Sequence, residues 1–315
     1  MPKKMIIDTD PGIDDAMAIL FALASPELQV VGLTTTFGNV HTETATRNAL
    51  RLLEFAGRSD IPVAHGAEVP LLGELDGVAD FVHGANGLGD IPHDDPLGTP
   101  HALYAAQFIV DTVMSHPGEV TLVPIGPLTN IALALAIEPA VAANVAGVVM
   151  MGGAATVSGN VNPAAEANIY SDPHAADRVL TAPWPSLTMV GLDVTEQVIM
   201  DEAYFHALRP SRTGAYIDSI CGFYLDFYER AYGVRMCHTH DPSAIAYVID
   251  PTLFRTQRGP IRVVTEGLGR GMTIWDRREH RYGPHAWTNR PPINVCLEVD
   301  GDRLLALYKE RILGA

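Results

Sequence analysis

The chain has 315 residues, of which 37 are Asp or Glu and 21 are Lys or Arg, so its formal net charge is −16 with histidine neutral. Such a surface repels nucleic acid and anionic lipid, so we expect no nucleic acid and no membrane as partners. Hydrophobic residues make up 47% and charged residues 18% of the chain, and this balance excludes intrinsic disorder and predicts a large core.

Short β-branched segments alternate with longer stretches of helical periodicity from the start of the chain. The pattern predicts, in order, a strand over residues 4–7, a helix over 13–24, a strand over 28–35 and a helix over 43–55. It continues with a helix over 102–115, a strand over 120–125, a helix over 128–136, a strand over 145–151, a helix over 173–180 and a strand over 187–191. The predicted fold is therefore α/β, an open, mostly parallel Rossmann-like sheet of at least five strands flanked by helices.

Residues 66–100 lack this periodicity and are rich in Gly, Pro, Asp and His. An irregular stretch of this length in a compact domain is either functional or disordered. The later chain predicts an aromatic helix over 214–231, a helix over 244–249, strands over 261–264, 272–275 and 293–298, and a closing helix over 303–313. No linker interrupts the pattern, so we expect a single domain over residues 1–315.

The three cysteines, Cys221, Cys237 and Cys296, show no metal-binding spacing, and their odd number does not predict a disulfide framework. The apolar segment at residues 5–7 is too short for a signal peptide, and no apolar run approaches the about 18 residues of a membrane span. These features predict a cytoplasmic protein with reduced thiols.

Four aspartates, Asp8, Asp10, Asp14 and Asp15, follow the first predicted strand, at the edge where open parallel sheets bind ligands. Asp14 and Asp15 suit the first turn of a helix, where its dipole favours acids. Asp8 and Asp10 have no such role, and the mutual repulsion of the group favours a bound cation. Oxygen ligands select a hard cation such as Ca²⁺ or Mg²⁺.

A second polar cluster follows the strand that ends at Met151. Asn160, Glu166 and Asn168 offer donors and acceptors suited to sugar hydroxyls, although an Asx-rich loop that makes its own turns is the alternative. His240 titrates near neutral pH. Asp241 stands at the start of a predicted helix, where capping is the ordinary role and metal ligation is the other.

The pair Asp8 and Asp10 also fits haloacid-dehalogenase-type phosphotransferases, which place two aspartates after their first strand and use Mg²⁺. Those enzymes have Thr or Val two positions after the second aspartate. This chain has Gly12 there, and Asp14 and Asp15 follow, so this fit is poor.

Nine short motifs together resemble the inosine-uridine nucleoside hydrolase family over nearly the whole chain. In chain order they are DTDPGIDDA (8–16), TFGNV (36–40), HGANGLG (83–89), GPLTN (126–130), MGG (151–153), AEAN (165–168), GLDVT (191–195), HDP (240–242) and RGMT (270–273). Each string alone is weak evidence, whereas nine in the family's order are strong evidence.

The resemblance implies Ca²⁺-dependent hydrolysis of the N-glycosidic bond of ribonucleosides, with release of ribose and a free base in nucleoside salvage or catabolism. It implies Asp10 as general base and His240 as acid, with Asp8 supporting the metal ligands from behind. The implied metal ligands are Asp10, Asp15, the main-chain oxygen of Ile125, and Asp241. The implied ribose contacts are Asp14, Asn39, Met151, Asn160, Glu166 and Asn168, and the implied base contacts are His83, Tyr228 and Tyr232. It also implies a homodimer or homotetramer.

The chain departs from the family pattern at two places. Ala167 stands where the family usually has an aromatic residue, and the segment from Met151 to Asn160 is one residue longer. A Ca²⁺-dependent nucleoside- or ribose-binding protein without catalysis is the remaining alternative. Such a protein is expected to have lost the base or the acid, whereas this chain has both Asp10 and His240.

Overall fold

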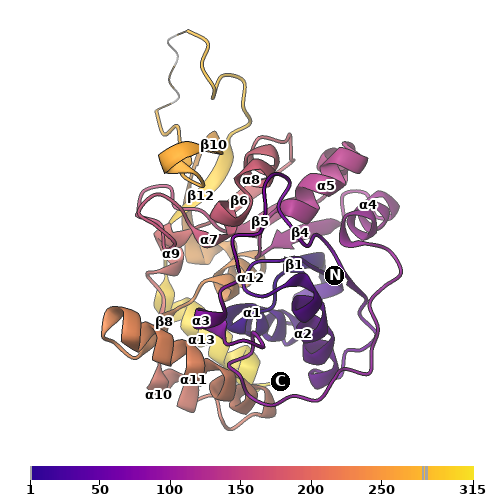
Figure 1. Cartoon of the computed structure of the whole chain (residues 1–315), viewed down its shortest axis with the longest axis vertical. Coiled ribbons are helices and arrows are strands. Elements are labelled where there is room, and N and C mark those ends of the chain that lie inside the picture. Colours follow the sequence, from indigo (N-terminus) through magenta and orange to yellow (C-terminus); the bar gives the residue numbers. More distant parts are fainter. Residues whose placement is uncertain (1, 279, 281–282) are drawn as a thin grey trace.

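A central eight-stranded sheet organises the computed structural model, which describes residues 2–278, 280 and 283–315 (Figure 1). The strand order is β3 (Val63–Ala64), β2 (Leu28–Thr35), β1 (Lys3–Thr9), β4 (Val120–Pro124), β5 (Gly147–Met151), β6 (Leu187–Val190), β12 (Ile293–Val299) and β9 (Phe254–Gly259). Neighbouring strands are parallel except at the edge, where β9 runs antiparallel to β12. The open, mostly parallel α/β sheet predicted from the sequence is confirmed.

Helices cover both faces of the sheet and divide the core into two clusters. One face packs against α1 (Ile13–Leu23), α2 (Thr42–Phe55), α11 (Arg212–Tyr232), α12 (Asp241–Ile249) and α13 (Gly301–Leu313). The other packs against α4 (Ala105–Ser115), α5 (Thr129–Ile137), α6 (Val141–Asn144) and α8 (Pro173–Leu180). In β1, Met5 and Ile7 belong to the first cluster and Ile6 to the second, as the two-residue period of a strand requires.

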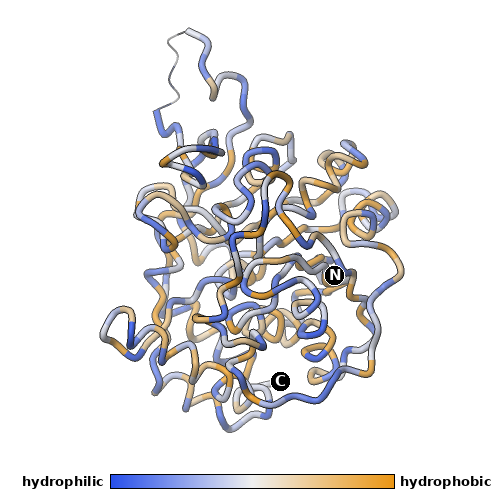
Figure 2. The backbone as a smooth tube through the Cα atoms, viewed as in Figure 1, coloured by the Kyte–Doolittle hydropathy of each residue, from blue (hydrophilic) through white to orange (hydrophobic). Residues whose placement is uncertain are grey.

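Short elements complete the fold. They are the helices α3 (Asp80–His83), α7 (Ala167–Ser171), α9 (Leu192–Thr195) and α10 (Glu202–His206), and two small antiparallel pairs, β7 (Ile199–Asp201) with β8 (Met236–His238) and β10 (Ile261–Val263) with β11 (Thr273–Trp275). Figure 2 shows hydrophobic residues recurring along the packed helices and strands and hydrophilic residues on many outer turns. Within the described residues, no helix is both long and apolar enough to cross a membrane.

The predicted elements recur in the expected order, with shifts at their ends. Residues 66–100 are irregular apart from the single turn of α3, whereas α12 begins at Asp241, three residues earlier than expected. Strand β9 was not predicted, because four of its six residues are exposed at the sheet edge and give no apolar pattern.

The order of the strands places a crevice between β1 and β4. From β1 the chain first builds the sheet outward through β2 and β3, and it then returns to add β4 on the other side of β1. The loops after these two strands therefore diverge over opposite faces, and ligands bind in the crevice that such a reversal opens. Asp10 follows β1 and Ile125 follows β4, so the fold brings both to this point.

Candidate active site

A cavity of about 330 Å³ opens at the carboxyl ends of the strands. Its walls include every predicted site residue except Asp10 and Asp15, which lie next to the wall in the acidic turn. The lining residues are Asp14, Asn39, Ala79, Phe81, Val82, His83, Ile125, Met151, Asn160, Val161, Glu166, Ala167, Asn168, Tyr224, Phe227, Tyr228, Tyr232, His240 and Asp241. A larger cavity of about 730 Å³ lies at the amino ends of the strands, but no predicted site residue lines it.

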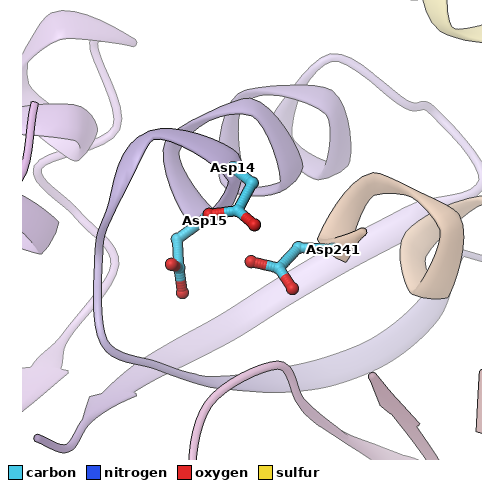
Figure 3. A group of neighbouring side chains, drawn as sticks. All are labelled: Asp14, Asp15 and Asp241. Carbon is cyan, nitrogen blue, oxygen red and sulfur yellow. The ribbon is translucent and has the colours of Figure 1, made fainter. Parts of the chain in front are cut away.

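Three buried carboxylates lie close together at the smaller cavity, and two of them, Asp14 and Asp241, line it. Figure 3 shows the three side chains grouped between two helix ends. Asp14 and Asp15 come from the first turn of α1 and Asp241 from the first turn of α12, and each offers an oxygen within 4.8 Å of the others. Burial, with repulsion from Asp14 next, raises the pKa of Asp15 to about 6, and burial also raises that of Asp14 to about 6. The pKa of Asp241 is raised by burial and by the neighbouring acids. The cluster is thus costly to ionise without a cation.

Asp15 is held by four hydrogen bonds. Its Oδ1 accepts from Thr9 Oγ1 at 2.5 Å and from the Asp10 amide at 3.2 Å, and its Oδ2 accepts from the Gly12 amide at 3.0 Å and from Asn39 Nδ2 at 2.8 Å. It therefore caps the start of α1, as acids in a first turn do. Asp241 makes no capping bond: His240 is the capping position of α12, so capping, the ordinary role expected for Asp241, is wrong.

Asp10 lies outside the group of three but adjoins it. Its Oδ2 accepts from the Asn39 amide at 2.6 Å, and burial together with Asp15 raises its pKa. The Asp10 carboxylate is confined between two glycines, since a Cβ on Gly38 or Gly126 would lie 2.0 or 2.4 Å from one of its oxygens. Among the described residues, Asp10 Oδ1 and Asp14 Oδ1 are buried with no hydrogen-bond partner. An all-oxygen set with unpaired buried oxygens fits a hard divalent cation.

Asp8 connects the end of β1 to neighbouring elements by hydrogen bonds. Its Oδ1 accepts from Thr34 Oγ1 at 2.5 Å and from Asn130 Nδ2 at 2.8 Å, which ties β1 to β2 and to α5. Burial raises the pKa of Asp8 to about 7, and the two hydrogen bonds offset part of that rise. Asp8 Oδ2, like Asp10 Oδ1, is buried with no hydrogen-bond partner among the described residues, so the supporting role of Asp8 stays a prediction.

Amide and acid groups form the wall beside the carboxylates. Asn168 Nδ2 donates to the Ile125 carbonyl at 2.8 Å, which holds that carbonyl against α7. Glu166 caps α7, accepting from the amides of Asn168 and Ile169 at 2.9 and 3.1 Å. Asn160 Oδ1 accepts from the Ala167 amide at 3.0 Å. The longer segment before Asn160 therefore still brings its side chain to the cavity wall.

Histidine and tyrosine rings form a further part of the cavity lining. His83 Nδ1 accepts from the Ile13 amide at 3.1 Å, and its ring stacks on Tyr224 with centroids 5.5 Å apart. His240 Nε2 lies 3.1 Å from the Tyr228 hydroxyl. Burial lowers the pKa of His83 to about 4 and that of His240 to about 3, so both rings are neutral at pH 7. The expectation that His240 titrates near neutral pH is therefore wrong, because burial disfavours its charged form.

Tyr224, Phe227 and Phe81 are wall residues that the sequence reasoning missed. A signal for Tyr224 was present: with Tyr228 and Tyr232 it forms a ladder at four-residue spacing, which places all three on one face of α11. Tyr228 stacks on Tyr232 with ring centroids 5.4 Å apart. The cavity is therefore lined by both aromatic rings and carboxylates.

Comparisons with known proteins point to one family. The sequence model of the family described as inosine-uridine preferring nucleoside hydrolase matches residues 5–306. Uridine nucleosidase 1 of Arabidopsis thaliana is 44% identical, with 99% of this chain and 93% of the relative covered. The inosine-uridine preferring nucleoside hydrolase of Leishmania major is 41% identical over 89% of this chain and 90% of its own. A solved plant nucleoside hydrolase superposes with a TM-score of 0.97 at 44% identity and covers 99% of both chains.

Proposed function

The chain belongs to the inosine-uridine preferring nucleoside hydrolase family, and from this premise we propose that it cleaves ribonucleosides with the help of Ca²⁺. It is an N-glycosyl hydrolase that acts on nucleosides. One observation carries the proposal beyond the family: a single cavity joins a buried carboxylate cluster to an aromatic wall. A nucleoside has two parts that match these groups: a ribose, whose hydroxyls suit the carboxylates, and a flat base, which suits the aromatic rings.

The cation would be held by Asp10, Asp15, Asp241 and the main-chain oxygen of Ile125. Oxygen donors of this kind suit Ca²⁺ better than softer metals. When bound, a divalent cation lowers the pKa of a coordinated water and so supplies a nucleophile at neutral pH. Asp14 also has an oxygen within 4.8 Å of Asp15 and Asp241, so it would stand between the cation and the sugar.

The ribose would lie over Met151 with its hydroxyls toward Asp14, Asn39, Glu166 and Asn168. Asn160 would meet the 5′ end of the sugar; it lines the cavity and accepts a hydrogen bond from the Ala167 amide. Breaking the glycosidic bond leaves positive charge on the ring, as in other glycosyl transfers. The buried carboxylates, already aligned, would stabilise that charge in a setting with little water.

Different groups would handle the protons of the water and of the leaving base. Asp10 would take the proton of the attacking water as general base, because its Oδ1 has no other described partner. His240 and Tyr228 would assist the leaving base by hydrogen bonding, while His83 and Tyr232 would contact its ring. In net terms, the water adds across the C1′–N bond and the base leaves in its neutral form.

Two earlier alternatives are less well supported. The phosphotransferase hypothesis rested on Asp8 and Asp10 alone and has no counterpart in the family to which the chain belongs. The binding-only hypothesis requires a lost base or acid, whereas Asp10 and His240 both stand in the site. A homodimer or homotetramer and a cytoplasmic role in nucleoside salvage or catabolism stay part of the proposal. Light scattering after size-exclusion chromatography measures the oligomer.

The deciding experiment is release of reducing sugar from uridine, cytidine, inosine and adenosine. The protein is first freed of metal with chelator and then assayed alone, with Ca²⁺ and with Mg²⁺. We expect turnover that chelator removes and that Ca²⁺ restores better than Mg²⁺. A folded protein that releases no sugar from any of the four contradicts the proposal, and turnover unaffected by chelator contradicts its metal requirement.

A further inference from the structure

Thr195 contacts the His240 imidazole on the side that faces away from the cavity. It ends the short helix α9, which follows β6, and its side chain is fully buried. Thr195 Oγ1 lies 2.9 Å from His240 Nδ1, while His240 Nε2 lies 3.1 Å from the Tyr228 hydroxyl. The imidazole is therefore fixed at both nitrogens, with the cavity on the Tyr228 side.

The direction of these hydrogen bonds follows from counting donors and acceptors. Among the described residues, His240 Nδ1 is the only hydrogen-bond partner of Thr195 Oγ1. If His240 donated from Nδ1, the Thr195 hydroxyl hydrogen would be buried with no acceptor, which is an unfavourable arrangement. Thr195 must therefore donate to Nδ1. A neutral imidazole carries one hydrogen, which then lies on Nε2 and is donated to the Tyr228 oxygen.

We propose that Thr195 is a positioning residue for departure of the base, because it fixes the tautomer of His240 that donates to the Tyr228 oxygen and so does not take up the Tyr228 hydroxyl hydrogen. This inference rests on the proposed function. With the opposite tautomer, the bare Nε2 would accept the Tyr228 hydrogen and withdraw it from the substrate. The Thr195 hydroxyl itself touches neither substrate nor cation.

The chemical step is balanced with these groups. The C1′–N bond breaks and its electron pair stays on the base, which takes the proton from the Tyr228 hydroxyl. The His240 Nε2–H stabilises the negative charge left on the Tyr228 oxygen. Asp10 takes a proton from the attacking water, and solvent exchange returns that proton to Tyr228. His240 thus keeps its hydrogen throughout, so its orientation, and not its ionisation, is what Thr195 controls.

The test compares two leaving groups in Thr195→Val and Thr195→Ser. Uridine releases a base that needs the Tyr228 proton, whereas 4-nitrophenyl β-D-ribofuranoside releases a stable phenolate that needs none. We expect Thr195→Val, which keeps the side-chain shape, to lower kcat on uridine about tenfold or more, the equivalent of one hydrogen bond. It should change kcat on the nitrophenyl riboside less than about threefold, and Thr195→Ser should recover most of the uridine rate.

A second readout does not depend on catalysis. Long-range ¹H–¹⁵N correlation of ¹⁵N-histidine-labelled protein distinguishes the two imidazole tautomers, and the signal of His240 is assigned by its loss in His240→Gln. We expect the Nε2–H form in the wild type and in Thr195→Ser, and a mixture in Thr195→Val. An Nδ1–H form in the wild type, or equal loss on both substrates in Thr195→Val, would overturn the proposal. A wild type inactive on nucleosides would refute the proposed function instead, and the tautomer would still decide the role of Thr195.

Discussion

The buried acids predict an unusual dependence of stability on pH and calcium. Each of Asp14 and Asp15 has a folded pKa of about 6 against an ordinary value of 3.8, which corresponds to roughly 3 kcal/mol per carboxylate. Between these two pH values the native state holds protons that the unfolded chain has released. Stability of the metal-free protein therefore falls as pH rises from about 4 to about 6, and the loss is complete above that.

Calcium should reverse this loss where the carboxylates are ionised. At a free concentration 100 times its Kd, the ion adds about 2.7 kcal/mol, or roughly 5 °C in Tm for a chain of this size. The assay is thermal unfolding followed by circular dichroism, in chelator and in excess Ca²⁺, at pH 5 and pH 7.5. We expect Ca²⁺ to raise the Tm clearly at pH 7.5 and less at pH 5, because protons compete for the same oxygens; this rise in Tm is called the calcium increment.

The variant Asp241→Asn tests whether these changes in Tm come from the carboxylate cluster or from the net charge of the protein. Loss of one repelling charge should raise the Tm of the metal-free protein at pH 7.5 and abolish the calcium increment. Asp111→Asn, an exposed change on α4 on the opposite face of the sheet, is the matched control and should keep the increment. A calcium increment equal at both pH values, or one that survives Asp241→Asn, would refute the reasoning.

Three further predictions concern turnover. Asp10→Asn should lower kcat by about 10²-fold or more while the circular dichroism spectrum stays unchanged; a near-normal kcat contradicts the base role. Asp193 accepts three hydrogen bonds from Ala155 and Thr156, which precede the wall residue Asn160 in the chain. Asp193→Ala should therefore displace Asn160 and raise KM for uridine more than it lowers kcat, and an unchanged KM contradicts this. Gly126→Ala places a Cβ 2.4 Å from Asp10 Oδ1 and should remove turnover, whereas Gly147→Ala, whose nearest atom lies at 3.5 Å, should retain it.

The order of the elements is readable from the sequence because burial periodicity is a local property. Strand β2 (Leu28–Thr35) and helix α8 (Pro173–Leu180) have the predicted bounds, since their apolar spacing reports the face that each packs on the sheet. Strand β9 (Phe254–Gly259) escaped prediction because edge pairing with β12 needs backbone groups and no apolar side chains. The short helices α7 and α9 escaped because too few residues lie in each to show a period.

Part of the site is also predictable from the sequence, because some of its residues are close together in the chain. The acidic turn from Asp8 to Asp15 lies within one strand–turn–helix unit, so its charge repulsion and its need for a cation follow from the sequence alone. The aromatic ladder of α11 is also local, since its three tyrosines recur at four-residue spacing, although the family resemblance implies only Tyr228 and Tyr232 as base contacts.

The tertiary structure alone decided which distant groups meet. Asp241 joins Asp14 because α12 packs against α1. Thr195, which follows β6 in α9, reaches His240 because α12 also packs against β6. Sequence spacing carries no information about such contacts, since strand order and helix packing set the distances between segments far apart in the chain. The sequence determined the groups available for chemistry, and the packing of the helices on the sheet decided their partners and the hydrogens that they hold.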